Sequence, residues 1–219
     1  MPAEGDQKKR QAKVCKITVR ISVICSAENE RNGMNEFIKS LRPGAVLNMS
    51  TRSVIGRLIR HTLAARSGIS AVECPNHDAI VVAFKGQLWI GESQPPVARL
   101  TSIEDYIRDM ERGFISRLRV LYPTGASAAD GIMAAQWWQD NIRNSPYDYW
   151  AFPRLIWKAL VADWWPKQAG KEWANWCTEG VANAWRIGAG IDPWKKTNPT
   201  PLTTLRRAES GGMVIEYEH

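Results

Sequence analysis

The sequence contains no apolar run close to the roughly 20 residues that a helix needs to cross a bilayer. We therefore expect no membrane-spanning helix. Residues 14–27 are largely apolar and follow a basic start, but Lys16 and Arg20 interrupt them where the apolar region of a signal peptide is continuous. Ile24 precedes Cys25, where a lipoprotein signal needs a small residue. These features predict a soluble chain that this segment does not export.

Cysteine and histidine are also scarce. The four cysteines are scattered, without a CxxC pair, which excludes a disulfide-rich secreted scaffold; they are Cys15, Cys25, Cys74 and Cys177. Only three histidines are present, namely His61, His77 and His219. A catalytic pair of cysteine and histidine therefore has few possible members.

The composition is that of a folded globular protein, with 44% apolar and 23% charged residues in 219. A polar break before Met34 predicts an appended arm at 1–33 and one domain at 34–219. The net charge of +7 favours approach to anionic polymers. The basic residues are dispersed, however, and no nucleic-acid-binding motif is present, so we expect no specific nucleic-acid partner.

Alternating apolar residues predict strands at 77–84 and 88–92, joined by a hairpin at 85–87. Helices are expected at 50–66 and 102–119, and a Trp-rich helical segment from Ile132 onward. Most of the eleven tryptophans lie in that segment. The fold class predicted is α+β, with an antiparallel sheet or small barrel packed against helices.

The helix predicted at 50–66 has apolar residues at three-to-four spacing, as on one face of an amphipathic helix: Val54, Ile55, Leu58, Ile59, Thr62 and Leu63. Ser50 or Ser53 can cap its start and Gly68 its end. His61 lies beside this stripe, and we interpret it as a structural or solvated histidine.

Cys177 is predicted at the start of the last Trp-rich helix, which Asn175 can cap and Gly188 can end. A helix N-terminus stabilises a thiolate through its free N–H groups and the positive end of its dipole. Cys177 is the only cysteine so placed, and it is therefore the candidate nucleophile. The structural alternative is a small buried residue among tryptophans.

His77 opens a predicted strand, so its side chain can project from the sheet toward a helix N-terminus and act as the base. Glu92 on the next strand is the candidate that orients the imidazole. A two-residue turn at positions 86 and 87 would place Glu92 opposite Val81, on the face of His77. A three-residue loop would place it on the other face. Ser93 and Gln94 are alternative orienting residues.

Four segments together resemble the circularly permuted NlpC-type papain-like cysteine hydrolases, in particular their YiiX-like branch. They are 77–82 (HDAIVV), 91–93 (GES), 146–149 (PYDY) and 176–181 (WCTEGV), and the likeness extends from about Leu41 to Leu205. Their order and spacing carry the resemblance. Four positions depart from the family pattern: Ala45 replaces Asp, Asp78-Ala79 replaces Val-Gly, and Thr178 replaces Ser.

The resemblance implies a permuted papain-like fold with Cys177 as nucleophile, His77 as base and Glu92 as third member. It implies acyl transfer through a thioester, with the backbone N–H of Cys177 binding the oxyanion, and no cofactor. Substrates expected from the family are cell-wall (peptidoglycan) peptides or, alternatively, lipid acyl groups. The resemblance also places the protein in a bacterial cytoplasm or in association with a phage.

Three other functions are compatible with parts of the sequence. The fold could serve as a non-catalytic wall-binding or scaffolding module. Cys74, His77 and Cys177 could form a zinc site, because Cys74 and His77 have ligand-like spacing. The basic arm could bind nucleic acid, which would make binding strongly salt-dependent.

Overall fold

The computed structural model describes residues 32–149, 153, 176–195 and 199–219. The chain divides into two compact units, Met1–Lys39 and Ser40–His219. In the first unit, residues 32–39 are helical. The arm predicted at 1–33 and much of the Trp-rich segment lie outside the described residues. No helix in the described part of the chain is long and apolar enough to cross a membrane.

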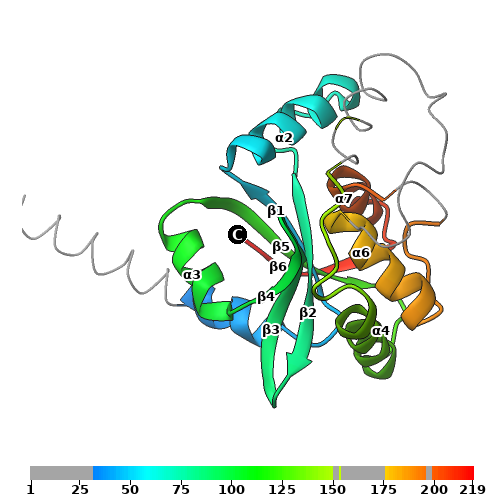
Figure 1. The fold of residues 1–219 in the computed structure, drawn as a ribbon. Helices are drawn as coiled ribbons and strands as arrows, with labels where there is room; N and C mark the ends of the chain where they lie inside the picture. The colour runs from blue at the N-terminus through cyan, green and yellow to red at the C-terminus, as the bar shows by residue number, and fades with distance from the viewer. Residues whose placement is uncertain (1–31, 150–152, 154–175, 196–198) are drawn as a thin grey trace, which may run out of the picture. The chain divides into compact units, whose positions relative to one another are not determined.

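A six-stranded antiparallel sheet forms the centre of the second unit, with the strand order β4-β3-β2-β1-β5-β6 (Figure 1). Its strands are β1 (Val46–Thr51), β2 (His77–Phe84), β3 (Gln87–Ser93), β4 (Ala98–Thr101), β5 (Ile115–Pro123) and β6 (Met213–Glu218). The strands in the middle of this order are the most deeply buried, and every residue of β1 is buried. The prediction of an α+β fold with an antiparallel sheet is therefore confirmed, and the arrangement is a sheet with two edges, not a closed barrel.

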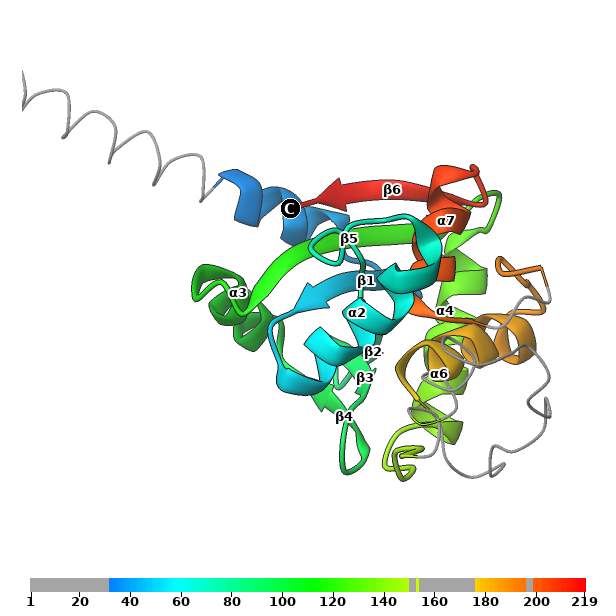
Figure 2. The ribbon, with the colours of Figure 1, turned by 90° about the horizontal axis from the view of Figure 1, so that it is seen from above.

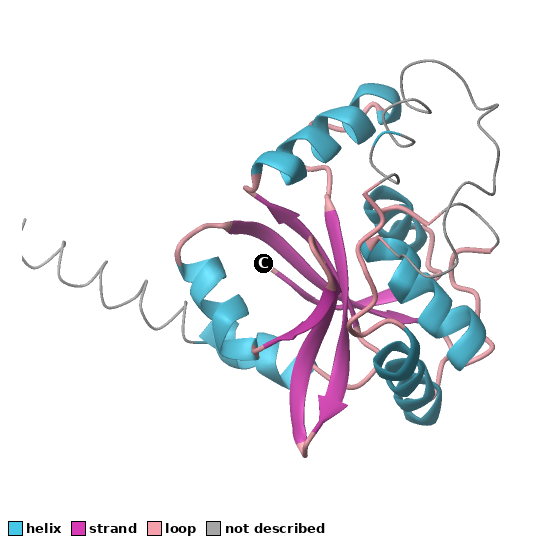
Figure 3. Ribbon diagram, in the orientation of Figure 1, coloured by secondary structure: helices cyan, strands magenta, loops and turns pink. Residues whose placement is uncertain are grey.

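Helices cover the sheet on both sides (Figures 2 and 3). They are α2 (Val54–Ser67), α3 (Ile103–Glu111), α4 (Ala128–Asn141), α6 (Cys177–Asn183), which continues into a π-helical turn η1 (Ala184–Gly188), and α7 (Pro201–Glu209). Helices α4, α6 and α7 lie on one side of the sheet, and α3 lies on the other. Residues that alternate along a strand therefore face different helices.

The β2–β3 hairpin turns at Lys85 and Gly86, whose φ angles of 51° and 78° are those of a two-residue hairpin turn. Phe84 pairs with Gln87, one position earlier than predicted on each strand. Continuing this register places Glu92 opposite Ala79, so the predicted pairing of Glu92 with Val81 is wrong. The shift is two residues, and since side chains alternate with a period of two, Glu92 stays on the predicted face.

The helix predicted at 102–119 is too long. Ser102 caps α3 as expected, its hydroxyl accepting from the Asp105 N–H, but the helix ends at Glu111. Gly113 follows with a φ of 65°, and residues from Ile115 onward form β5. The reason is tertiary: β5 pairs with β1 on one side and β6 on the other, and this pairing overrides the helical spacing of its apolar residues.

Helix α2 begins later than predicted, because Ser50 belongs to β1. Ser53 is the cap, its hydroxyl accepting from the Gly56 N–H at 2.9 Å, and Gly68 ends the helix with a φ of 71°. The apolar stripe of this helix is only partly buried. Ile59 and Thr62 face the interior, whereas Val54 is 74% exposed, Ile55 49% and Leu58 47%.

Candidate active site

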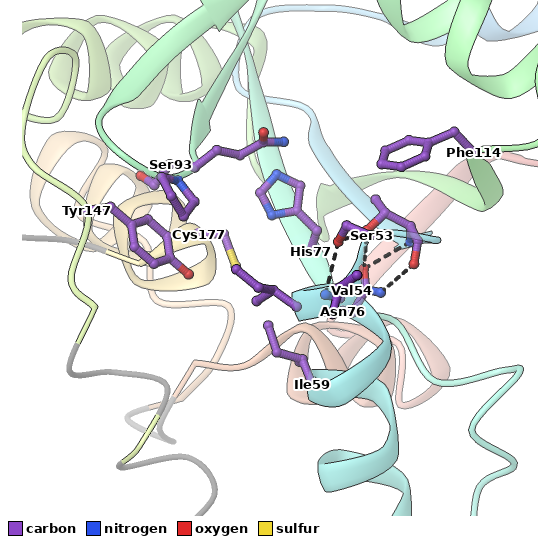
Figure 4. Close-up of a pocket in the computed structure, with 14 residues that line it drawn as sticks. Ser53, Val54, Ile59, Asn76, His77, Ser93, Phe114, Tyr147 and Cys177 are labelled. Carbon is purple, nitrogen blue, oxygen red and sulfur yellow. Dashed lines mark hydrogen bonds between the residues drawn. The ribbon is translucent and has the colours of Figure 1, made fainter.

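The fold brings His77 and Cys177, a hundred residues apart in the sequence, to one cavity of about 320 Å³ (Figure 4). His77 is the first residue of β2, and Cys177 is the first residue of α6. Both side chains border this cavity in the close-up, the imidazole projecting from β2 and the sulfur from α6. The sequence predicted that His77, at the start of a strand, can project its side chain toward the N-terminus of a packed helix. The structure has His77 at the start of β2 and Cys177 at the start of α6.

The residue before His77 fixes the start of the strand. Asn76 is buried, and its side chain donates to the Thr51 carbonyl at 2.8 Å and accepts from the Thr51 N–H at 3.0 Å. Its own N–H donates to the Met49 carbonyl at 2.9 Å. These three hydrogen bonds to β1 hold the backbone next to His77, from which the imidazole projects (Figure 4).

Glu92 contacts His77 directly: its Oε2 lies 3.2 Å from the Nε2 of His77. The carboxylate is 2% exposed, and four further side chains approach it. These are Gln94 (Nε2 to Oε2, 2.7 Å), Tyr106 (hydroxyl to Oε2, 2.6 Å), Thr101 (hydroxyl to Oε1, 2.5 Å) and Arg99 (Nε to Oε1, 3.5 Å). Because Nε2 contacts Glu92, the Nδ1 atom of the imidazole is left for another partner.

The electrostatics of the pair follow from this geometry. Burial alone would raise the pKa of Glu92, but its contacts with His77, Thr101 and Tyr106 outweigh burial and lower the pKa to about 2. Burial likewise disfavours the charged form of His77, but hydrogen bonds and charge interactions with Cys177 and Glu92 raise its pKa to about 10. At neutral pH the pair is therefore a charged imidazolium held against a carboxylate.

Cys177 is 2% exposed and opens α6, as predicted. The predicted cap, Asn175, lies outside the described residues. The N-cap is Trp176, whose side chain makes no capping hydrogen bond. The Trp176 side chain therefore leaves the N–H groups of the first turn, which have no partner within a helix, to other acceptors. Val181 and Trp185 follow Cys177 at steps of four residues, and they are 1% and 0% exposed.

On the opposite face of β2, Asp78 joins the helices to the strand that carries His77. Its carboxylate accepts from the Asn48 amide at 2.6 Å and the Thr204 hydroxyl at 2.8 Å, and it also binds the Thr178 hydroxyl. Burial raises the pKa of Asp78, and these three hydrogen bonds act in the opposite direction. Thr178 follows Cys177, and its hydroxyl lies 3.8 Å from the Cys177 sulfur. The two departures from the family pattern at 78 and 178 thus contact each other.

The alternative orienting residues have other roles. Gln94 points its amide at Glu92, so it supports the carboxylate and does not replace it. Ser93 lies on the other face of β3, where its hydroxyl is buried and has no hydrogen-bond partner among the described residues. Glu92 is therefore the residue that contacts the imidazole.

Cys74 is separate from this site. It is buried, its sulfur lies 3.7 Å from the Pro75 carbonyl, and burial raises its pKa to about 11. No group of three His, Cys, Asp or Glu side chains within the described ranges could hold a metal ion. The zinc site hypothesised from Cys74, His77 and Cys177 is therefore not formed by these residues.

Tyr106 and Thr101, which bind Glu92, were not predicted. Tyr106 is 4% exposed on α3, and its place beside Glu92 depends on how that helix packs against β3. The amphipathic pattern of α3 predicts that Tyr106 is buried, but it does not predict that Tyr106 contacts Glu92. Arg99 lies opposite Glu92 on β4, a pairing that only the strand register defines.

No protein-family model matches the chain, and no curated protein matches it. Five chains among the solved structures are similar. One is the crystal structure of the metalloprotein yiiX from Escherichia coli O157:H7, with 19% sequence identity and a TM-score of 0.47. The match covers 81% of this chain and 86% of that chain. A TM-score below 0.5 is a weak likeness, so function has to be inferred from the residues of this chain.

Proposed function

We propose that the protein is a cysteine-dependent hydrolase that cleaves an amide or ester bond through a thioester intermediate. The observation that carries this proposal is the placement of the His77 imidazole between the Glu92 carboxylate and the Cys177 thiol. Each member comes from a different element, and the order histidine, acid, cysteine is that of the permuted papain-like hydrolases. The buried Glu92 contact supports a fixed ring orientation, with one nitrogen directed to the thiol.

In the proposed reaction, the Cys177 sulfur, its proton held by His77, attacks the substrate carbonyl carbon. A C–S bond forms, and the carbonyl π electrons move to oxygen. The tetrahedral intermediate collapses as the imidazolium gives its proton to the leaving amine or alcohol. Water, deprotonated by His77, then attacks the thioester, which releases the acid and regenerates the thiol.

The oxyanion of each tetrahedral intermediate needs hydrogen-bond donors. The backbone N–H of Cys177 is the proposed donor, because it lies at the start of α6, where the Trp176 side chain makes no capping hydrogen bond. The positive end of the helix dipole favours negative charge at the same place.

Two substrate classes fit this chemistry. A cell-wall (peptidoglycan) peptide is the class implied by the family resemblance. The cavity, however, has an apolar border, since Val54, Ile55 and Phe114 line it and are all substantially exposed. This border favours the second candidate, a lipid acyl group whose chain would lie along these side chains.

Parallel incubation with purified peptidoglycan and with phospholipid, followed by mass spectrometry of the products, tests the proposal. The wild type is expected to release products from one of the two, and Cys177→Ala and His77→Ala to release none. Cys74→Ser removes the other described cysteine, buried away from the site, and should retain activity. Equal product release by Cys177→Ala would refute the proposal.

A thiol probe gives an independent measurement. Iodoacetamide at pH 7 is expected to modify Cys177 faster than Cys74, and His77→Ala should slow modification of Cys177. Peptide mapping distinguishes these from Cys15 and Cys25. Equal rates at Cys177 and in a denatured control would mean that His77 does not activate the thiol.

A further inference from the structure

Three large aliphatic side chains on α2 lie in solvent. Val54, Ile55 and Leu58 are 74%, 49% and 47% exposed. A surface helix of a globular protein normally turns such a stripe toward the core. On α2, Ile59 and Thr62 are buried against the rest of the protein, whereas the other half of the apolar stripe is exposed to solvent.

The same helix is strongly basic. Residues 52–66 contain four arginines and one histidine and no aspartate or glutamate. At about 100° per residue, His61 falls on the line of Val54 and Leu58, and Arg57 flanks it. Arg52 and Arg57 are exposed and form no ion pair within the part of the chain that the structure describes. Uncompensated positive charge and exposed aliphatic groups therefore share one helix face.

We propose that α2 docks the protein on a membrane surface that carries anionic headgroups. Val54, Ile55 and Leu58 would enter the headgroup–acyl boundary, and Arg52 and Arg57 would pair with lipid phosphates. Interfacial helices combine basic residues and aliphatic groups in this way. Val54 and Ile55 also line the cavity that holds Cys177, so docking places the mouth of this cavity at the membrane.

The charge and the composition of the patch favour a membrane over a protein partner. Protein interfaces are centred on large aromatic, methionine and arginine side chains. On α2 the exposed apolar residues are all aliphatic, and residues 52–67 contain no phenylalanine, tyrosine, tryptophan or methionine. An anionic lipid surface attracts arginines, and each arginine near the surface strengthens binding about fivefold.

Vesicle cosedimentation with the full-length chain tests the proposal. The wild type should bind phosphatidylglycerol–phosphatidylcholine vesicles and bind pure phosphatidylcholine at least tenfold more weakly, with binding that falls as salt rises. The triple variant Val54→Ser/Ile55→Ser/Leu58→Ser should lose at least tenfold in binding. The matched control Ile132→Ser/Met133→Ser, at positions 57% and 47% exposed on α4, should bind as the wild type does.

Charge is tested separately. Arg57→Gln should weaken binding to the anionic vesicles about fivefold. Lys85→Asn removes one positive charge at the distant β2–β3 turn and should have less effect. Thermal melts establish that each variant is folded. All these positions are exposed, so their substitution should leave the fold intact.

Several results would overturn the proposal: no binding to anionic vesicles, equal binding to neutral ones, or full binding by the triple variant. Self-association through α2, or α2-dependent binding to nucleic acid in place of vesicles, would also overturn it. Docking does not depend on the proposed hydrolysis. Cys177→Ala should bind vesicles normally, so absent hydrolysis with intact vesicle binding would refute the hydrolase proposal alone.

Discussion

Glu92 Oε2 lies 3.2 Å from His77 Nε2, across the hairpin formed by β2 and β3. His77 is the first residue of its strand and Glu92 the last but one of the next. The register places the two side chains diagonally on one face, and donors from β4 and α3 complete the shell around the carboxylate. An acid held this firmly fixes one tautomer and one orientation of the imidazole.

Replacing Glu92 by glutamine should therefore lower kcat/KM strongly while preserving the fold. An amide in place of the acid of such a triad can stabilise the wrong tautomer, which costs about 10⁴-fold in a serine protease, so a loss of about 100-fold or more is expected. Steady-state kinetics measure this loss. Glu104→Gln, at an exposed position on α3, is the charge-matched control. Wild-type activity in Glu92→Gln would show that Glu92 does not orient the base.

The pKa shifts of the pair predict how its contribution to stability depends on pH. Burial opposes both charged forms, but mutual attraction and the contacts with Cys177 raise the pKa of His77 to about 10. The stabilisation from His77 is thus complete below its unfolded value of about 6.5 and is lost as pH rises toward 10. The pKa of Glu92 is lowered to about 2, so its stabilisation is complete above about 4.5 and is lost as pH falls toward 2.

The free energy of unfolding of wild type relative to Glu92→Gln should therefore be largest between about pH 4.5 and 6.5. Urea denaturation at a series of pH values measures this difference. It should shrink toward pH 10 and toward pH 2. A difference that is constant from pH 5 to pH 10 would contradict a charged pair at this position.

Tyr106→Phe removes one donor from Glu92 without changing the shape of the side chain. The hydroxyl lies 2.6 Å from Oε2, and a hydrogen bond to a charged group contributes about 2 kcal/mol. We expect a loss of stability of about that size, together with a several-fold fall in kcat and little change in KM. Tyr149→Phe, at a position 57% exposed, is the control. An equal effect of both changes would mean that the Glu92 contact is not responsible.

The local parts of the site could be predicted because they depend on short-range signals. Alternation predicted the bounds of β2 to the residue, and the cap residue Asn175 together with Gly188 as the stop placed Cys177 at the start of the helix that is α6. The face of Glu92 was predicted although its register was not, since an error of two residues leaves a strand face unchanged. The roles assigned to Cys177, His77 and Glu92 remain predictions.

The rest depends on tertiary contacts that no local pattern defines. The segment 115–119 has helical spacing but pairs as β5, because β1 and β6 offer it backbone partners. Helix α7 was missed, although Thr200 and Pro201 are ordinary start signals and its capping box is present. The spacing of Val54 and Leu58 predicts that they are buried on the inner face of the helix, but both are exposed.

Thr204 on α7 connects two buried groups, the Asp78 carboxylate and the Trp194 indole. Its hydroxyl donates to Asp78 Oδ2 at 2.8 Å and accepts from the Trp194 indole N–H at 3.0 Å. Thr204→Val keeps the shape but removes one hydrogen bond from the buried Asp78 carboxylate and one from the buried Trp194 N–H. Each such loss costs about 1–3 kcal/mol, so the free energy of unfolding should fall by about 3 kcal/mol.

Thr204→Ser retains the hydroxyl and should recover most of this stability, which urea denaturation measures for both variants. Because Asp78 also binds Thr178, the residue after Cys177, the valine variant should slow modification of Cys177 by iodoacetamide as well. The serine variant should not. A valine variant as stable as the serine variant would mean that water replaces the Thr204 hydroxyl, and that Asp78 does not depend on α7 to hold the strand of His77 against α6.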